Sequence, residues 1–184
     1  MGLGGAFDDI LGAAQANSGW AFTRLHQWLA PAVSAYVRVQ GVGDAEDVVS
    51  EVFLAAFTRI GTFQGGEAEF RSWVFTIAHH RIIDQRRAGA RRLPTETLDR
   101  ATDAVHAPSA EDVALPALEL GRLRAVLDLL TPDQRNVLVL RVIADLSVDQ
   151  VAEAVGKQPG AVRALQHRAV LHLRRALAAE AVTR

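Results

Sequence analysis

The sequence contains no cysteine among its 184 residues. This absence excludes disulfide bonds, thiolate nucleophiles and zinc sites with cysteine ligands. No stretch approaches the roughly 20 apolar residues of a membrane-spanning helix. The first residues also lack a basic segment followed by an apolar run, so we expect no signal peptide. The sequence therefore predicts a cytoplasmic protein without membrane insertion.

The chain also has almost no net charge, because its 20 lysines and arginines nearly balance its 21 carboxylates and leave a formal net charge of −1. The charges are nevertheless segregated along the chain, with arginines concentrated between residues 134 and 184 and carboxylates between residues 95 and 112. A hydrophobic content of 49% is enough to build a core. The segregation predicts partners of opposite charge at different places along the chain.

Apolar residues recur at helical spacing nearly throughout, which predicts an all-α fold. Capping residues such as Asp44, Thr131 and Ser147 precede several of these segments, and Pro31 predicts a kink or a split within the second one. The expected helices are Phe7–Ala16, Gly19–Val39, Ala45–Ile60, Phe70–Ala88, Pro116–Leu130, Pro132–Ile143, Val148–Val155 and Pro159–Ala179.

The periodic pattern breaks between the two ends of the chain. Residues 93–115 combine prolines, small polar residues and acids without an apolar face, which is typical of a flexible linker. We therefore predict two small helical domains, residues 1–92 and 116–184, joined by a flexible acidic linker.

The C-terminal segment has the pattern of a helix-turn-helix. A short helix after Ser147 is followed by Gly156 and then by a longer basic helix. In such motifs the second helix enters the major groove of DNA, where arginine and glutamine side chains bind base edges. A helical hairpin with a solvated basic face is the alternative interpretation.

Three segments of the N-terminal part need a functional explanation. Residues 44–57 place acids beside apolar residues at helical spacing, residues 61–70 form a glycine-rich loop, and residues 70–92 combine aromatic residues with an arginine-rich face. Aromatic and arginine side chains together suit single-stranded DNA. The alternatives are an ordinary capped helix, a plain connector and core positions for Phe70 and Trp73.

These segments resemble, in the same order, those of the extracytoplasmic function (ECF, group 4) sigma factors of the sigma-70 family. The run DAEDVVSEVF is similar to the family's region 2.2, FRSWVFTIAHHRIIDQRR to regions 2.3 and 2.4, and LTPDQRNVLVLR with the following helix-turn-helix to region 4. The resemblance implies a region 2 helical bundle and a region 4 helix-turn-helix. It also implies promoter-specific transcription initiation with core RNA polymerase.

The resemblance assigns three groups of contact residues. Residues expected to bind the polymerase clamp are Asp44, Glu46, Asp47, Val48, Glu51 and Phe53. Those expected at the −10 element are Phe63, Gln64, Phe70, Arg71, Trp73, His80, Arg81, Asp84 and Arg87. Those expected at the −35 element are Gln158, Arg163, Ala164, His167 and Arg168.

The same resemblance implies further partners, namely the polymerase flap, promoter DNA and an anti-sigma factor. It implies no catalytic site, no cofactor and no metal. A stand-alone DNA-binding regulator is the alternative, but it leaves the two N-terminal segments unexplained. An enzyme is the second alternative, with His79, His80 and Asp84 as its best candidates. Adjacent histidines point about 100° apart on a helix, however, and His80 with Asp84 would give an incomplete metal site.

Overall fold

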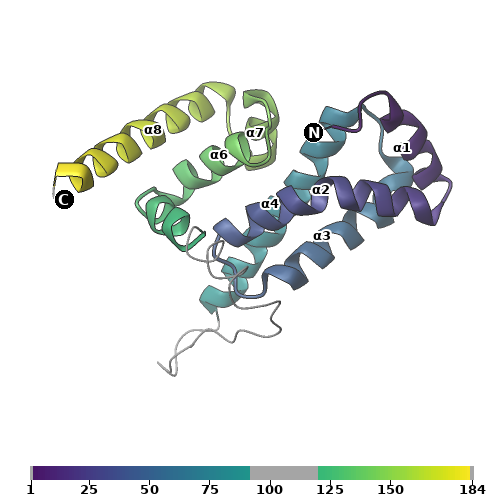
Figure 1. Cartoon of the computed structure of the whole chain (residues 1–184), viewed down its shortest axis with the longest axis horizontal. Helices are drawn as coiled ribbons and strands as arrows, with labels where there is room; N and C mark the ends of the chain where they lie inside the picture. Colours follow the sequence, from purple (N-terminus) through teal and green to yellow (C-terminus); the bar gives the residue numbers. More distant parts are fainter. Residues whose placement is uncertain (1, 92–119, 183–184) are drawn as a thin grey trace.

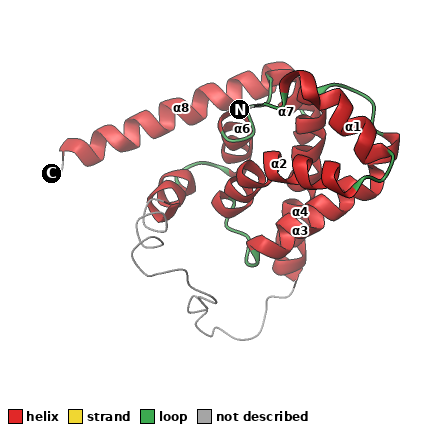
Figure 2. Cartoon of the chain, turned by 45° about the vertical axis from the view of Figure 1, so that its right-hand side comes forward, coloured by secondary structure: helices red, strands yellow, loops and turns green. Residues whose placement is uncertain are grey.

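The structure is a computed structural model that describes residues 2–91 and 120–182. Every regular element in these two ranges is helical, so the all-α prediction is confirmed (Figure 2). Residues 93–115, predicted as a linker, lie outside the described residues. The elements are η1 (Gly4–Ala6), α1 (Phe7–Gln15), α2 (Gly19–Val39), α3 (Ala45–Arg59), η2 (Ile60–Thr62), α4 (Glu67–Arg91), a helix over 120–128, α6 (Pro132–Val142), α7 (Val148–Val155) and α8 (Pro159–Val182).

Helices α1–α4 form a bundle in the N-terminal half, residues 2–91 (Figure 1). Its core consists of apolar residues that recur every three or four positions, because such residues share one face of a helix. Leu25, Leu29 and Val33 of α2, for example, are fully buried. The bundle thereby holds α3, α4 and the loop between them in fixed relative positions.

The C-terminal half, residues 120–182, contains the predicted helix-turn-helix in α7 and α8. Helices α6 and α7 both begin with a reciprocal capping box, formed by Thr131 with Gln134 and by Ser147 with Gln150. Gly156 ends α7 with a φ of 65°, a left-handed conformation that glycine adopts without steric cost. The far end of α8 projects away from the body of the molecule (Figures 1 and 2).

Helices α2 and α4 differ from the sequence prediction in ways that the packing explains, and α4 and α8 also end three residues later than predicted, at Arg91 and Val182. Helix α4 begins at Glu67 and not at Phe70, because the backbone N–H of Gly66 donates a hydrogen bond of 3.0 Å to Glu69 Oε2 and caps an additional turn. Helix α2 runs unbroken through Pro31, so the predicted split is wrong. Residues before and after Pro31 are buried in the same core, which supports the helix across the missing N–H.

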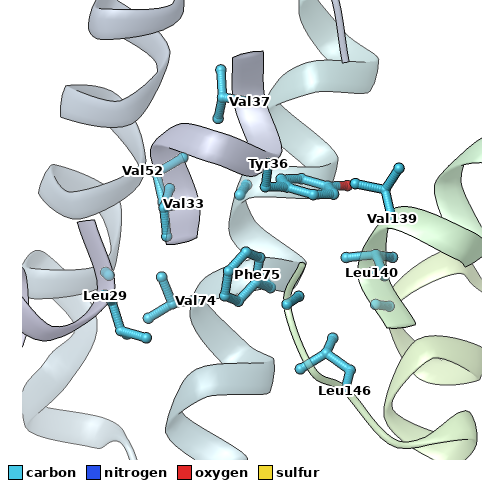
Figure 3. Close-up of a cluster of buried hydrophobic side chains, with 14 of the residues drawn as sticks. Leu29, Val33, Tyr36, Val37, Val52, Val74, Phe75, Val139, Leu140 and Leu146 are labelled. Atoms are coloured by element: carbon cyan, nitrogen blue, oxygen red, sulfur yellow. The ribbon is translucent and has the colours of Figure 1, made fainter. Parts of the chain in front are cut away.

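The two halves pack against each other, which the sequence pattern did not indicate. Figure 3 shows Tyr36 and Phe75 of the N-terminal half in one buried cluster with Val139, Leu140 and Leu146 of the C-terminal half. All five side chains are at most 2% exposed. Helix α7 also packs on α4. The helix-turn-helix therefore packs against α4, the helix that carries the aromatic and arginine residues.

Candidate nucleic-acid interface

The loop between α3 and α4 is shaped by Gly65 and by the aromatic rings of Phe63 and Trp73, which we call the aromatic floor. Gly65 has a φ of 141°, and a Cβ atom there would lie 2.9 Å from Cβ of Glu69 and 3.3 Å from Cζ of Phe63. The Phe63 ring lies 5.1 Å from the rings of both Phe70 and Trp73. Glycine at this position thus allows the loop to fold closely over its aromatic neighbours.

Gln15 of α1 fixes the same loop from the other side. Its Nε2 donates hydrogen bonds to the backbone carbonyls of Ile60, at 3.1 Å, and Phe63, at 2.9 Å. The N-terminal segment adds a third restraint, because Gly4 N donates a hydrogen bond of 2.7 Å to Glu67 Oε2. The loop is therefore held in one conformation by α1 and by the segment before it.

A cavity of about 400 Å³ opens beside this loop. Phe63, Gln64 and Trp73 line it from the N-terminal half, and Gln150 and Glu153 line it from α7. Phe63 and Trp73 are half-buried and Gln64 is exposed, so aromatic and amide groups face the cavity together. Such walls can stack on a planar base and form hydrogen bonds with its edge.

The remaining −10 candidates follow along α4. Arg71 is half-buried, and its Nε donates a hydrogen bond of 2.6 Å to the carbonyl of Ala144. His80, Arg81, Asp84 and Arg87 are exposed. Arg81 lies 3.8 Å from Glu51, and Arg87 lies 4.0 Å from Asp84. Together these side chains form an exposed polar face that continues from the cavity.

Phe70 needs a correction, since it was predicted to contact −10 DNA. Its side chain is 1% exposed, and its ring packs against those of Phe7, Phe63 and Trp73. The Phe70 ring packs against the aromatic floor, and it is not accessible to a ligand in this structure. The alternative interpretation of Phe70 as a core residue is the one that the burial supports.

The five −35 candidates lie on the exposed surface of the C-terminal half. Gln158 immediately precedes α8, and Arg163, Ala164, His167 and Arg168 follow within its first three turns. None of their side chains is buried. Residues 163 and 164 lie four positions before residues 167 and 168, so the two adjacent pairs stack over one another on one outward face of the helix. This face carries both positive charge and hydrogen-bond donors, which suits contact with DNA.

The acidic candidates surround the start of α3. Asp44 caps the helix by accepting a hydrogen bond of 3.1 Å from Asp47 N, and the carboxylates of Glu46, Asp47 and Glu51 are exposed. Val48 and Phe53 were predicted to contact the polymerase, but they are 0% and 5% exposed and belong to the core. The positions of Val48 and Phe53 in the motif are explained by core packing, which leaves the carboxylates of Glu46, Asp47 and Glu51 pointing outward.

A buried polar network lies where the two halves meet. Gln40 is 2% exposed and accepts hydrogen bonds from Arg86 at its carbonyl and at Oε1, while its Nε2 donates to Asn136 Oδ1 at 3.2 Å. Burial lowers the pKa of Arg86. At the same junction, Arg124 Nε donates a hydrogen bond of 2.8 Å to the carbonyl of Arg38. Gln40, Arg86 and Asn136 thus satisfy one another by hydrogen bonds at this junction.

His79 and Tyr36 form a second buried pair, with 3.1 Å between the Tyr36 hydroxyl and His79 Nδ1. Burial, and then the positive charges of His80 and Arg86, lower the pKa of His79 from 6.5 to about 4. Burial raises the pKa of Tyr36. His79 is therefore neutral at physiological pH, and its ring is occupied by a structural hydrogen bond.

The residues named for the enzyme alternative, His79, His80 and Asp84, are not brought together in one metal site in the described part of the chain. The rings of His79 and His80 are 6.1 Å apart, with His79 buried and His80 exposed. Within residues 2–91 and 120–182, no three His, Asp or Glu side chains are grouped so as to hold a metal ion. None of the helices in these ranges is long and apolar enough to cross a membrane.

Four residues of this interface were missed from the sequence: Gln15, Gln40, Gln150 and Glu153. Gln15 and Gln150 donate to backbone carbonyls, which leave no trace in a sequence pattern. Gln40 bonds to the side chains of Arg86 and Asn136, which are distant in the sequence. Glu153 belongs to α7, whose sequence has the pattern of an ordinary amphipathic helix. Only the packing of α7 on α4 brings it to the cavity.

Comparisons with known proteins agree on one family. Residues 19–92 match the model of sigma-70 region 2, and residues 120–173 match that of sigma-70 region 4. The chain is 36% identical over 171 residues to the ECF RNA polymerase sigma factor BldN of Streptomyces coelicolor, covering 92% of this chain and 65% of BldN. It is 33% identical over 180 residues to the ECF RNA polymerase sigma factor SigD of Mycobacterium tuberculosis, covering 93% of this chain and 84% of SigD.

Solved structures show the same fold. The chain matches CnrH, solved in complex with the cytosolic domain of CnrY, with a TM-score of 0.70 and 25% identity over 95% of this chain and 98% of CnrH. It also matches RpoE of Bartonella quintana, solved with the anti-sigma factor NepR, with a TM-score of 0.64 and 22% identity over 85% and 96% of the two chains.

The fold and the interface therefore define a promoter-recognition subunit of the sigma-70 class. The chain belongs to the ECF sigma factors of that family. Sigma factors are specificity subunits of RNA polymerase and have no catalytic site of their own.

Proposed function

We propose that this protein binds core RNA polymerase in the cytoplasm and directs it to promoters through two separate DNA contacts. The exposed face of α8 recognises the −35 duplex. The loop over residues 61–66 and the polar face of α4 melt and capture the −10 element. Polymerase supplies the catalytic chemistry.

The cavity beside Phe63, Gln64 and Trp73 is the observation that carries this proposal. It offers aromatic walls and an exposed amide at the start of a helix whose next turns present His80, Arg81 and Arg87. A base flipped into the cavity would leave its strand running along that helix. Stacking contributes about 1–3 kcal/mol per base, which offsets the cost of unstacking.

The exposed carboxylates of α3 provide the polymerase contact in this proposal. Asp47 and Glu46 project from the first turn, and Val48 packs inward to fix their direction. Complementary charge mainly increases the association rate and sets the register of docking. We further propose that an anti-sigma factor regulates the protein. This is supported by the likeness to CnrH, which was solved in complex with the cytosolic domain of CnrY.

Transcription with purified core polymerase tests the proposal. A pool of GC-rich bacterial promoter fragments is transcribed with and without the protein, and start sites are mapped. We expect start sites that appear only with the protein. Trp73→Ala should abolish most of them, whereas the matched control Trp20→Ala, at a site 56% exposed at the start of α2, should not. The absence of initiation by folded protein would refute the proposal.

A further inference from the structure

A second cavity, of about 570 Å³, lies at the junction of the two halves of the chain. It shares no lining residue with the cavity beside the loop over residues 61–66, and none of the proposed −10 or −35 residues lines it. Its charged lining residues are Arg86 of α4, Arg124 and Asp128 of the helix over 120–128, and Arg135 of α6. Both halves therefore contribute charged side chains to one cavity.

Positive charge is in excess around this cavity. Three guanidinium groups and one carboxylate line it, so two positive charges are not balanced by the lining residues. Arg86, Arg124 and Arg135 are half-buried, whereas Asp128 is exposed. Water therefore screens the one carboxylate more completely than it screens the three arginines.

Two of the arginines are close enough to repel each other. Burial lowers the pKa of Arg86, and the positive charge of Arg135 lowers it further. Arg135 alone among the three has a carboxylate partner within the described residues, because its Nη2 lies 2.7 Å from Asp128 Oδ1. Like charges that are partly withdrawn from water are stabilised by a bound anion.

Backbone carbonyls position the three guanidinium groups. Each group donates to one carbonyl: Arg86 to Gln40, Arg124 to Arg38, and Arg135 to Leu127. Arg124 uses only its Nε, so both of its terminal nitrogens lack an acceptor among residues 2–91 and 120–182. The guanidinium groups are thus oriented in advance, and N–H groups remain available for a ligand.

Gly41 leaves room for a ligand next to Arg124. Its φ is 71°, a conformation that glycine adopts without steric cost. A Cβ atom there would lie 4.0 Å from Arg124 Nη2, which places this nitrogen beside the part of the cavity wall that Gly41 forms. A longer side chain at this position would extend towards the guanidinium group and reduce the space in front of it.

We propose that this cavity binds a small phosphorylated molecule, with its phosphate group among Arg86, Arg124 and Arg135. Arginine binds phosphate oxygens through paired, charge-assisted hydrogen bonds, and three arginines can engage different oxygens of one tetrahedral group. A phosphate dianion also balances the two uncompensated charges, which a single carboxylate or chloride ion does not.

The cavity is larger than a phosphate group alone requires. Its volume of about 570 Å³ lies within the roughly 300–1,000 Å³ that is typical of small-molecule sites. Val39, Leu130 and Pro132 add apolar wall next to the arginines. The volume and this wall fit the organic part of a phosphate ester.

Pyrophosphate is the probe for this site, because it has the phosphate chemistry without an organic group. Its binding is measured by isothermal titration calorimetry on the full chain, in phosphate-free and magnesium-free buffer at constant ionic strength. We expect saturable binding with one site per chain. Pyrophosphate should also raise the melting temperature, because a ligand that only the folded chain binds stabilises it. The result does not depend on the proposed function, since neither polymerase nor DNA is present.

Arg124→Gln removes one guanidinium group from the cavity. We expect pyrophosphate to bind this variant about tenfold more weakly, because charge-assisted hydrogen bonds are lost. Arg122→Gln is the matched control, because it changes the net charge equally and lies on the same helix. Arg122 is exposed and does not line the cavity, so this variant should bind pyrophosphate as the wild type does.

Asp128→Asn should change the affinity in the opposite direction. The substitution keeps an oxygen acceptor for Arg135 but removes the one carboxylate that lines the cavity. We expect pyrophosphate to bind about threefold to tenfold more tightly, because the repulsion between two anions is removed. A gain in affinity cannot result from misfolding, so this variant keeps the test decisive if Arg124→Gln is unstable.

Three results would overturn the proposal. The first is the absence of saturable pyrophosphate binding by the folded wild type. The second is equal weakening in Arg124→Gln and Arg122→Gln, which would assign the binding to net charge and not to this cavity. The third is an affinity of Asp128→Asn that is no higher than that of the wild type.

Discussion

The Nε atom of Arg71 on α4 donates a hydrogen bond of 2.6 Å to the carbonyl of Ala144, in the turn between α6 and α7. The two residues are 73 positions apart in the sequence. Arg71 is a proposed −10 contact, yet here it is bound by the half of the chain that carries the proposed −35 surface. One side chain thus links the proposed −10 surface to the half of the chain that carries the proposed −35 surface.

Gln40 is predicted to be a stability determinant at the junction of the halves. Gln40→Leu removes two of its side-chain hydrogen bonds, those with Arg86 and Asn136, in a buried environment. We expect the free energy of unfolding to fall by about 2–3 kcal/mol, measured by urea denaturation.

Gln40→Glu is the matched control for this change. It keeps an acceptor for Arg86, and the Asn136 amide can turn to donate to the new carboxylate. A loss of less than about 1 kcal/mol is expected. An equal loss in both variants would contradict the assignment of the stability to these hydrogen bonds.

The low pKa of His79 predicts acid sensitivity. Folded protein keeps His79 neutral down to about pH 4, whereas the unfolded chain takes up a proton below about pH 6.5. The unfolded state then binds more protons, so stability falls as the pH decreases from 6.5 towards 4. Between pH 7 and pH 5 the contribution of this residue is a loss of about 2 kcal/mol.

Urea denaturation at a series of pH values measures this effect. His79→Gln retains a hydrogen-bonding side chain opposite Tyr36 but cannot titrate. The pH dependence between 7 and 5 should be shallower in this variant than in the wild type by about the same 2 kcal/mol. Parallel curves for the two proteins would contradict the assignment to His79.

Gly65→Ala is expected to distort the loop over residues 61–66, which we propose captures the −10 element. The new Cβ would lie 2.9 Å from Glu69 Cβ, and the φ of 141° is strained for any residue with a side chain. We expect a cost of about 1–3 kcal/mol and a loss of −10 strand capture in complexes with polymerase. Gly61→Ala is the control, because nothing lies within 4 Å of a Cβ atom there. Similar capture by the two variants would argue against a fixed loop conformation.

Arg163 is expected to contribute base recognition and not only charge. Arg163→Ala should reduce binding of polymerase holoenzyme to its own promoter by about 1–3 kcal/mol and relax the preference at one −35 base pair. Arg174→Ala, further along the same helix, should weaken all promoters alike and lower the salt dependence of binding. Competition binding across single-base −35 variants distinguishes these effects. A uniform loss in Arg163→Ala would assign it to the phosphate backbone.

Much of the fold could be predicted from the sequence, because helix starts have local signals. Ala45, Pro132 and Val148 begin helices as expected, each after a residue whose side chain caps the helix. The start of α4 was missed, since its cap comes from Glu69 binding back to Gly66 within a loop. The split of α2 predicted at Pro31 was wrong, because tertiary packing stabilises the helix on both sides of this residue.

The sequence indicated which segments carry the proposed contact residues, but not which of these residues are buried. Val48, Phe53 and Phe70 occupy functional motifs, but they pack inward and leave their neighbours to face outward. A motif gives the spacing of residues, whereas tertiary packing decides which of them are accessible. Several hydrogen bonds between the halves had no sequence signal, because Ala68, Ala144 and Arg38 take part through backbone carbonyls.

Permanganate probing of promoter melting tests the central claim most directly. Core polymerase is incubated with a mapped promoter, with and without this protein, and unpaired thymines are detected in the −10 region. The account predicts reactive −10 thymines only when core polymerase and the protein are both present, and their loss in Trp73→Ala. Unreactive thymines with folded protein and active core polymerase would contradict its assignment as the subunit that opens the promoter.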